Sequence, residues 1–426
     1  MTTRARPPIL LTMADYYGTL AAVRSLGRLG IPVTVAESKL LAPARWSRYV
    51  TRRVECPDVG DSDAFLEWLL RFGEAEPGHV LYPTSDDMAW LFALHREELG
   101  RHFRMYQPDV DVIYALLNKK KLHDLCEGVG LEMPDTWFPE SEADLEKVAA
   151  EARFPVLLKP QTQILFESHV KGSQVERASE LLPRYREFLE RNRYGRKLLD
   201  YDGRANRPMV QAFYTEAAQN IFSLSGFVDR TGELFVARGA LKVLQRPRKL
   251  GIGLCFEEVP VDAELAEKVR ALCKKLGYHG TFEVEFIRAG GKQLLIDFNP
   301  RFYSQMGFDI ARGSPLPLLV YEAACGHEER LGEVAREALG WRGGGQYIYC
   351  HRGIFELLLR AQGLSGRLSG DEVRHWREWY ARNRERAVDA VIDTGDWVPW
   401  MVDVAMHLRS YARHPRGFIR TMVLDR

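Results

Sequence analysis

The sequence predicts a mixed α/β protein that begins with an open, parallel α/β domain and ends in a helical region. Three observations favour this fold class. Apolar runs alternate with amphipathic stretches up to about residue 115, which is typical of strands and helices around a parallel sheet. Two apolar runs within 281–298 flank a Gly-Gly turn and predict a β-hairpin. From about residue 336 the chain carries Arg and Trp at helical spacing.

The composition is that of an ordinary globular protein. Of the 426 residues, 46% are hydrophobic and 27% are charged, and a net charge of +1 gives no overall attraction to nucleic acid. The six cysteines are scattered without metal-ligand spacing, which indicates reduced thiols and a cytoplasmic protein. The apolar run 9–11 is too short for a signal peptide, and no stretch approaches the roughly 18 apolar residues of a membrane span.

The first part of the chain reads as strands and helices in alternation. Strands are predicted over 8–13, 31–37 and 79–84, and helices over 17–29 and 88–99. The first strand–helix turn, Met13 to Gly18, lacks the glycine fingerprint of a dinucleotide site. An oxidoreductase that uses NAD(P) therefore has weak support.

The middle of the chain reads as an α+β region whose apolar strands are interrupted by polar residues. A helix is predicted over 114–128, a strand over 154–160 that ends in Lys159, strands over 208–213, 220–229 and 234–244, a basic loop over 245–253, and a helix over 263–277. Buried strands do not carry charged groups without partners, so these interruptions are candidate site residues.

The predicted hairpin carries the strongest functional signal. Glu283 and Glu285 share one face of its first strand, and Asp297 and Asn299 share one face of its second. Carboxylate and amide oxygens are the ligands that Mg²⁺ prefers, and Arg301 adds a cation suited to phosphate or carboxylate. A surface hairpin with solvated acids is the alternative.

The order Lys119, Lys159, Gln211, Glu285 and the segment 297–301 (Asp-Phe-Asn-Pro-Arg) resembles the ATP-grasp superfamily, especially the carbamoyl-phosphate-synthetase-like carboxylate–amine ligases. The resemblance covers about residues 5–335 and implies a two-lobed ATP-binding domain. It implies that Glu285, Asp297 and Asn299 hold Mg²⁺ (or Mn²⁺), and that Lys119 and Lys159 reach the phosphates of ATP. Asp297 stands where the family usually has Glu, with a shorter reach to the metal.

The same resemblance assigns the remaining nucleotide contacts. Gln211, Ala212 and Phe213 match the hinge that holds adenine, and Glu216 and Gln219 compete for the ribose. From the cluster of basic residues over 242–253 rather than from the resemblance, Lys242 is expected to contact the nucleotide, with a solvated basic hairpin tip as the alternative. Arg246, in the basic loop after it, is expected to clamp the γ-phosphate or the substrate carboxylate, or else to belong to a solvated hairpin tip.

The expected function is that of an ATP-dependent ligase that activates a substrate carboxylate as an acylphosphate and joins it to an amine or a thiol. The expected catalytic residues are Arg301 and Arg246. The stretch 161–173 has Gly172 as its sole glycine where family members often have several, so a non-catalytic nucleotide-binding regulator or scaffold is the alternative. The implied partners are a small carboxylate and an amine.

The expected divisions are an N-terminal α/β domain over 1–115, a first lobe over 116–205, a second lobe over 206–335 and a helical region over 336–426. In the last region, Trp376, Trp379, Trp397 and Trp400 are expected to pack between helices. The alternatives are a lid over the substrate, a homodimer contact, and contact with an anionic membrane surface.

Overall fold

The computed structural model describes residues 6–167, 172–214, 221–248, 251–343 and 346–425. Its first sheet has five parallel strands in the order β3-β2-β1-β4-β5. The strands are β1 (Ile9–Leu11), β2 (Val33–Ala36), β3 (Arg52–Val54), β4 (Val80–Leu81) and β5 (Arg104–Met105). The helices are α1 (Tyr17–Arg28), η1 (Pro43–Trp46), α2 (Ser62–Ala75), α3 (Asp86–Leu94) and α4 (Arg96–Leu99). The predicted parallel α/β domain is therefore present.

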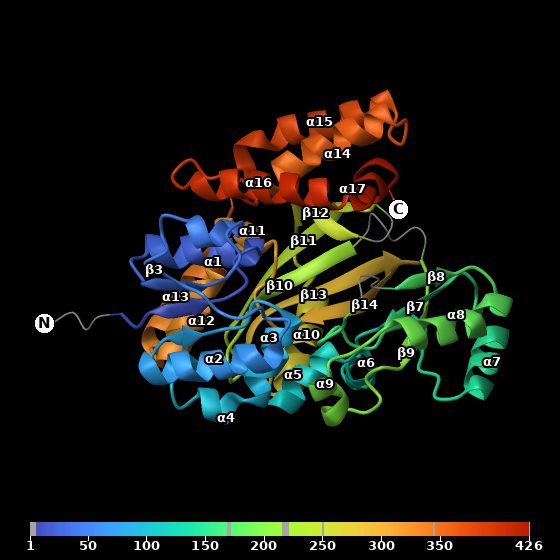
Figure 1. Cartoon of the computed structure of the whole chain (residues 1–426), viewed down its shortest axis with the longest axis horizontal. Coiled ribbons are helices and arrows are strands. Elements are labelled where there is room, and N and C mark those ends of the chain that lie inside the picture. The colour runs from blue at the N-terminus through green and yellow to red at the C-terminus, as the bar shows by residue number, and fades with distance from the viewer. Residues whose placement is uncertain (1–5, 168–171, 215–220, 249–250, 344–345, 426) are drawn as a thin grey trace, which may run out of the picture.

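The second sheet is smaller and antiparallel, with the order β6-β9-β7-β8. Its strands are β6 (Thr136–Trp137), β7 (Val156–Pro160), β8 (Ser173–Val175) and β9 (Pro208–Ala212). The helices of this part are α5 (Val110–Leu117), α6 (Lys119–Glu127), α7 (Glu142–Glu151), α8 (Ala178–Arg191) and α9 (Arg196–Tyr201). In Figure 1 this sheet and its helices α7 and α8 form a separate lobe at the side of the molecule.

The helix predicted over 114–128 is divided into α5 and α6 at Asn118. This residue has extended backbone angles, and its side chain accepts hydrogen bonds from the N–H groups of Lys120 and Lys121. Asn118 is thus the N-cap of a new helix. The break places Lys119 at the first position of α6, where its side chain can leave the helix toward the large sheet.

The third sheet has seven strands in the order β14-β13-β10-β11-β12-β15-β16. Its strands are β10 (Ile221–Val228), β11 (Phe235–Arg246), β12 (Ile252–Val259), β13 (Gly280–Ala289), β14 (Lys292–Asn299), β15 (Ile348–Cys350) and β16 (Ala387–Asp389). The helices that follow its strands are α10 (Ala263–Leu276), α11 (Met306–Ala311), α12 (Leu316–Cys325) and α13 (Glu328–Gly340). The helical region therefore contributes two short strands, β15 and β16, that the sequence did not predict.

The remaining helices form a cap over one end of the large sheet (Figure 1). They are α14 (Arg352–Leu364), α15 (Gly370–Asn383), η3 (Arg384–Arg386), α16 (Val398–Arg413), α17 (Pro415–Phe418) and η4 (Ile419–Val423). Trp379 is buried against Phe355, with ring centroids 6.0 Å apart, as the packing prediction requires. Trp397 and Trp400 depart from that prediction, because they are 57% and 42% exposed. Among the described helices, none has the length and apolar character to cross a bilayer.

Candidate functional site

The hairpin β13–β14 brings its four acidic and amide side chains together as predicted. Across the two strands Glu283 lies opposite Asn299 and Glu285 lies opposite Asp297, and a bulge follows directly after Glu285. Because directly opposed residues point to the same side of a sheet, two acid-bearing pairs lie next to each other. The hairpin thus offers carboxylate and amide oxygens at one place.

Two buried lysines neutralise two of these carboxylates. Lys242, from β11, donates to Glu285, and Lys119, from the start of α6, donates to Oδ1 of Asp297 at 2.6 Å. Burial acts to lower the pKa of Lys242, but Glu285 raises it above its ordinary value. Burial acts to raise the pKa of Asp297, but Lys119, with Lys159 and Arg301, brings it below its ordinary value. Lys242 and Asp297 therefore stay charged at neutral pH.

Arg301 links the hairpin to the N-terminal domain. Its Nη2 donates to Oδ1 of Asn299 at 2.9 Å, its Nη1 to the carbonyl oxygen of Phe302 at 3.0 Å, and its Nε to Oδ1 of Asp86 at 2.6 Å. Burial acts to lower the pKa of Arg301, but the adjacent Asp86 carboxylate raises it. The guanidinium is thus fixed from three sides beside the proposed metal ligands.

Sequence reasoning missed Asp86 as a site residue. It is the first residue of α3, after the short connection 82–85 that follows β4, in the stretch Ser85-Asp86-Asp87. The carboxyl ends of β1 and β4 mark the point where the strand order of the parallel sheet reverses, which is where ligands bind in open α/β folds. The signal in the sequence that could have identified Asp86 is the pair of acids that follows the apolar run 79–84.

Glu283 is a buried acceptor of hydrogen bonds from residues around the site. It accepts hydrogen bonds from Nδ2 of Asn299 at 3.0 Å, from Oγ of Ser223 at 3.2 Å and from the Gln305 amide. Burial, together with Glu285, raises the pKa of Glu283 to about 7. Its hydrogen bonds orient the Asn299 amide, which makes Glu283 a neighbour of the proposed metal ligands.

The smaller sheet supplies the second group of predicted residues. Lys159 lies near the end of β7 and its Nζ is 3.5 Å from Oε1 of Gln211 on β9, while Nε2 of Gln211 donates to Oγ1 of Thr136 at 3.1 Å. Ala212 ends β9 and Phe213 follows it. The charge of Lys159 also acts to lower the pKa of Asp297 on the large sheet.

Several predicted features fall outside the described residues. Glu216 and Gln219, the candidates for the ribose contact, lie in 215–220, and 168–171 of the glycine-poor stretch is likewise outside. Arg246 is described, and it lies against the C-terminal helices. Its Nη1 is 3.3 Å from the Tyr411 hydroxyl and 3.3 Å from Sδ of Met422.

His351, Asp403 and His407 form a further polar cluster that sequence reasoning missed. Their ligand atoms lie within 4.8 Å of one another, as in a metal site. However, Nδ1 of His351 accepts from the N–H of Ile354 at 3.2 Å, which assigns the imidazole proton to Nε2 and directs it to Oδ2 of Asp403 at 3.1 Å. A metal-bound imidazole has the opposite polarity, with the bare nitrogen on the metal. The geometry fits a hydrogen-bonded junction between helices.

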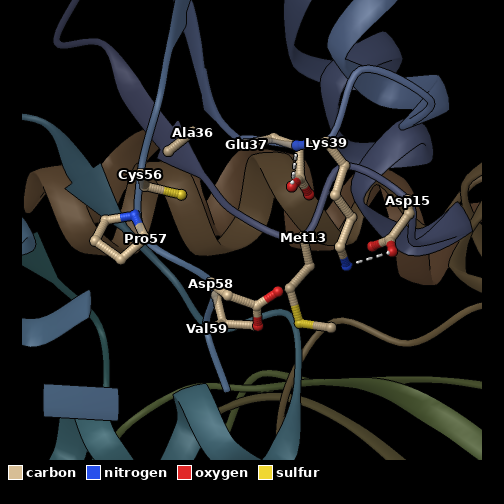
Figure 2. Close-up of a pocket in the computed structure, with 9 residues that line it drawn as sticks. All are labelled: Met13, Asp15, Ala36, Glu37, Lys39, Cys56, Pro57, Asp58 and Val59. Atoms are coloured by element: carbon tan, nitrogen blue, oxygen red, sulfur yellow. Dashed lines mark hydrogen bonds and ion pairs between the residues drawn. The ribbon is translucent and has the colours of Figure 1, made fainter. Parts of the chain in front are cut away.

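A small hollow lies at the carboxyl ends of β1, β2 and β3 (Figure 2). Its lining consists of Met13, Asp15, Ala36, Glu37, Lys39, Cys56, Pro57, Asp58 and Val59. Figure 2 shows Lys39 reaching Asp15, with 3.0 Å between Nζ and Oδ2, and Glu37 turned toward the backbone N–H of Lys39. Burial, with Glu37 and Asp58, raises the pKa of Cys56 to about 12, so its thiol stays protonated and is no nucleophile at neutral pH.

Comparisons with known proteins identify the fold. No family model matches the sequence, and a search of curated proteins finds no relative. Solved structures do match. The biotin carboxylase domain of 2-oxoglutarate carboxylase from Hydrogenobacter thermophilus, solved with MgADP and bicarbonate, has a TM-score of 0.59 at 15% identity, over 81% of this chain and 74% of that one.

Two N5-carboxyaminoimidazole synthetases are also similar. The protein from Staphylococcus aureus has a TM-score of 0.55 at 13% identity, over 75% of this chain and 78% of that one. The protein from Thermus thermophilus has a TM-score of 0.53 at 19% identity, over 80% of this chain and 82% of that one. The chain therefore has the ATP-grasp fold that the motif order predicted. At these identities the likeness is one of fold.

Proposed function

We propose that this protein is an ATP-dependent, Mg²⁺-requiring ligase that activates a substrate carboxylate as an acylphosphate and joins it to an amine or a thiol. The observation that carries the proposal is the hairpin, where Glu285, Asp297 and Asn299 lie together with Arg301, Lys119 and Lys242 around them. Phosphoryl transfer needs positioned charge more than covalent help, and this cluster supplies charge of both signs.

The donor set suits a hard divalent cation. Glu285 and Asp297 each have two carboxylate oxygens, of which the lysine contacts take one, and the Asn299 oxygen has a second lone pair beside its bond with Arg301. These three residues would hold Mg²⁺ or Mn²⁺. A bound cation would neutralise charge on the phosphate oxygens of ATP.

The side chains then have separate roles. Lys119 and Lys159 neutralise and orient the phosphates, Gln211 with the backbone of Ala212 and Phe213 holds the adenine, and Lys242 exchanges its contact with Glu285 for phosphate. Glu216 and Gln219 remain the candidates for the ribose. Arg301 stabilises charge on the transferring phosphoryl group, and Arg246 is proposed to approach the substrate carboxylate from the side of the C-terminal helices.

The proposed reaction balances without a protein nucleophile. A carboxylate oxygen forms a bond to the γ-phosphorus, the bond to the bridging oxygen breaks, and ADP leaves. The amine nitrogen then bonds to the acyl carbon, phosphate leaves with the former carboxylate oxygen, and the amine loses a proton. A regulator without catalysis, the alternative suggested by the glycine-poor stretch, has no further observation in its favour.

The test is ADP release across a panel of carboxylates, bicarbonate included, each paired with a panel of amines and thiols. The double variant Glu285→Gln plus Asp297→Asn keeps the shape of both side chains and removes both charges. We expect it to lose activity by roughly a hundredfold or more. Circular dichroism checks its folding, because Lys242 and Lys119 lose their partners.

The matched control is Glu264→Gln plus Glu267→Gln, which removes two exposed charges from α10. We expect it to behave as wild type. Full Mg²⁺-dependent turnover of the hairpin variant would reject the proposed metal site, and binding of MgATP without turnover on the whole panel would favour the regulator.

A further inference from the structure

Helix α16 is turned with its apolar side to solvent. Asp403, at 1% exposure, faces the protein, while the residues on the opposite side are large and exposed. They are Trp397 (57%), Trp400 (42%), Met401 (51%), Val404 (40%) and Leu408 (65%). The spacing 397, 401, 404, 408 places them in one stripe along the helix. Helices of soluble proteins ordinarily turn the opposite way, and a contiguous exposed apolar stripe of this kind is typical of an interaction surface.

The polar contacts beneath α16 hold it in this orientation. Asp403 accepts from the Tyr17 hydroxyl at 3.2 Å on α1 and contacts Nε2 of His351, the N-cap of α14, at 3.1 Å. His407 adds a contact with Tyr17 at 3.1 Å. Rotating the helix to bury its tryptophans would leave the Asp403 carboxylate without these partners. The outward apolar stripe is therefore fixed by the fold.

The exposed arginine, aspartate and glutamate side chains of the segment 397–424 carry charge of one sign. Within 397–424 the sole acidic residue is Asp403, which is buried, and the four arginines Arg409, Arg413, Arg416 and Arg420 are all exposed. Helix α16 also packs against the turn η1, where Trp46 is 37% exposed and Arg48 is exposed. An apolar stripe with tryptophans, followed in the chain by exposed arginines, complements an anionic surface with an apolar interior.

We propose that the face formed by Trp397, Trp400, Met401, Val404 and Leu408 docks on the surface of an anionic lipid bilayer. A second copy of this chain fits less well, because a two-fold contact would bring the arginine-rich C-terminal segments of both copies toward each other. The protein would lie on the bilayer without crossing it, with the indole rings at the headgroup level. This inference concerns where the protein works and is independent of the ligase reaction.

The test is co-sedimentation of the full chain with vesicles. Phosphatidylcholine mixed with phosphatidylglycerol is compared with phosphatidylcholine alone, at low and high salt. We expect wild type to bind the anionic vesicles, and Met401→Glu plus Leu408→Glu to reduce that binding at least about tenfold. Both positions are exposed, so the substitutions leave the core intact.

The matched control is Leu339→Glu plus Leu364→Glu, which places the same two charges at exposed leucines on α13 and α14, outside the stripe. We expect it to bind as wild type does. A second variant, Arg413→Gln plus Arg416→Gln plus Arg420→Gln, tests the contribution of the arginines. We expect its binding to anionic vesicles to fall roughly fivefold per arginine and to depend less on salt.

Four results would overturn the proposal. One is that wild type stays in the supernatant with anionic vesicles. Another is a dimer in sedimentation equilibrium that Met401→Glu plus Leu408→Glu converts to monomer, which would assign the stripe to a second copy. The third is equal binding of anionic vesicles by wild type, by Met401→Glu plus Leu408→Glu, and by the triple arginine variant. Binding of polyglutamate in place of vesicles would assign the surface to an acidic protein.

Discussion

Arg301 joins two parts of the chain that are far apart in sequence. Its guanidinium is held by Asp86 from the N-terminal domain and by Asn299 from the hairpin. Because the planar group is fixed from several sides, it would keep its orientation toward the phosphate that the proposed function places beside it. A lysine at this position would supply charge without that orientation.

Asp87, next to Asp86, offers a test at the scale of a single residue. Its Oδ1 accepts from the N–H of Leu165 at 2.7 Å, and burial raises its pKa to about 6. The native state therefore binds more protons than the unfolded chain between about pH 4 and pH 6. Stability contributed by this group falls as the pH rises through that range.

We expect Asp87→Asn, which keeps the oxygen acceptor, to raise the free energy of unfolding by about 3 kcal/mol at pH 8 and to change it little near pH 4. Urea unfolding at both values measures this. Asp371→Asn is the control, because Asp371 is also in the first turn of a helix but its side chain is 90% exposed. An equal effect of Asp87→Asn at both pH values would contradict the assignment.

The sequence was informative about residues that interrupt apolar strands. Glu285, Asp297, Asn299 and Lys159 could be selected because charged or amide groups in such strands need partners. The partners themselves could not be selected. Asp86 is 215 residues from Arg301, and such pairs depend on how the sheets meet rather than on local spacing. His351 could not be selected for the same reason, since its partners are on α1 and α16.

At the scale of elements, periodicity predicted most strands and long helices. It failed where a side chain overrides it, as at the Asn118 cap that divides α5 from α6. It also failed for β15 and β16, which have three residues each and therefore too few for an alternating pattern. The orientation of α16 could not be predicted, because its buried polar side depends on partners distant in sequence.

Helix α1 positions the end of the hairpin, which gives a test at this scale. A Cβ atom at Gly18 would lie 2.4 Å from the carbonyl oxygen of Tyr303, two residues after Arg301. We expect Gly18→Ala to displace this backbone, to reduce ADP release and to lower the free energy of unfolding by about 1–3 kcal/mol.

The control for this prediction is Gly332→Ala, on α13, where an added Cβ meets nothing within 4 Å. We expect it to raise the free energy of unfolding by up to about 1 kcal/mol, since alanine favours helix. Unaltered stability and ADP release in Gly18→Ala would contradict the close approach of α1 to the site.

At the scale of the whole molecule, the C-terminal region is fastened to the N-terminal domain. Asp396, before α16, is 2% exposed and accepts from Nε of Arg24 at 2.9 Å, Oγ of Ser47 at 2.6 Å and the N–H of Arg48 at 2.8 Å. We still propose division of the chain into domains at 1–115, 116–205, 206–335 and 336–426. The contacts of Asp396 join the last of these divisions, 336–426, to the first, 1–115.

Removal of the buried Asp396 carboxylate is expected to destabilise the folded protein. We expect Asp396→Ala to lower the free energy of unfolding by about 3–5 kcal/mol, because Arg24 is left buried without its partner. Asp393→Ala is the control, since its partner Arg28 is 47% exposed, and it should cost no more than about 1 kcal/mol. Similar urea midpoints for both variants would contradict a stabilising role of the buried ion pair between Arg24 and Asp396.

The central claim is that the ATP site activates a carboxylate. The most direct measurement uses a carboxylate labelled with ¹⁸O, under conditions where ADP is released with an amine, and determines the label in the phosphate by mass spectrometry. An acylphosphate route predicts one labelled oxygen from the carboxylate in each phosphate formed. Phosphate that carries oxygen from water alone would contradict it and identify the activity as ATP hydrolysis.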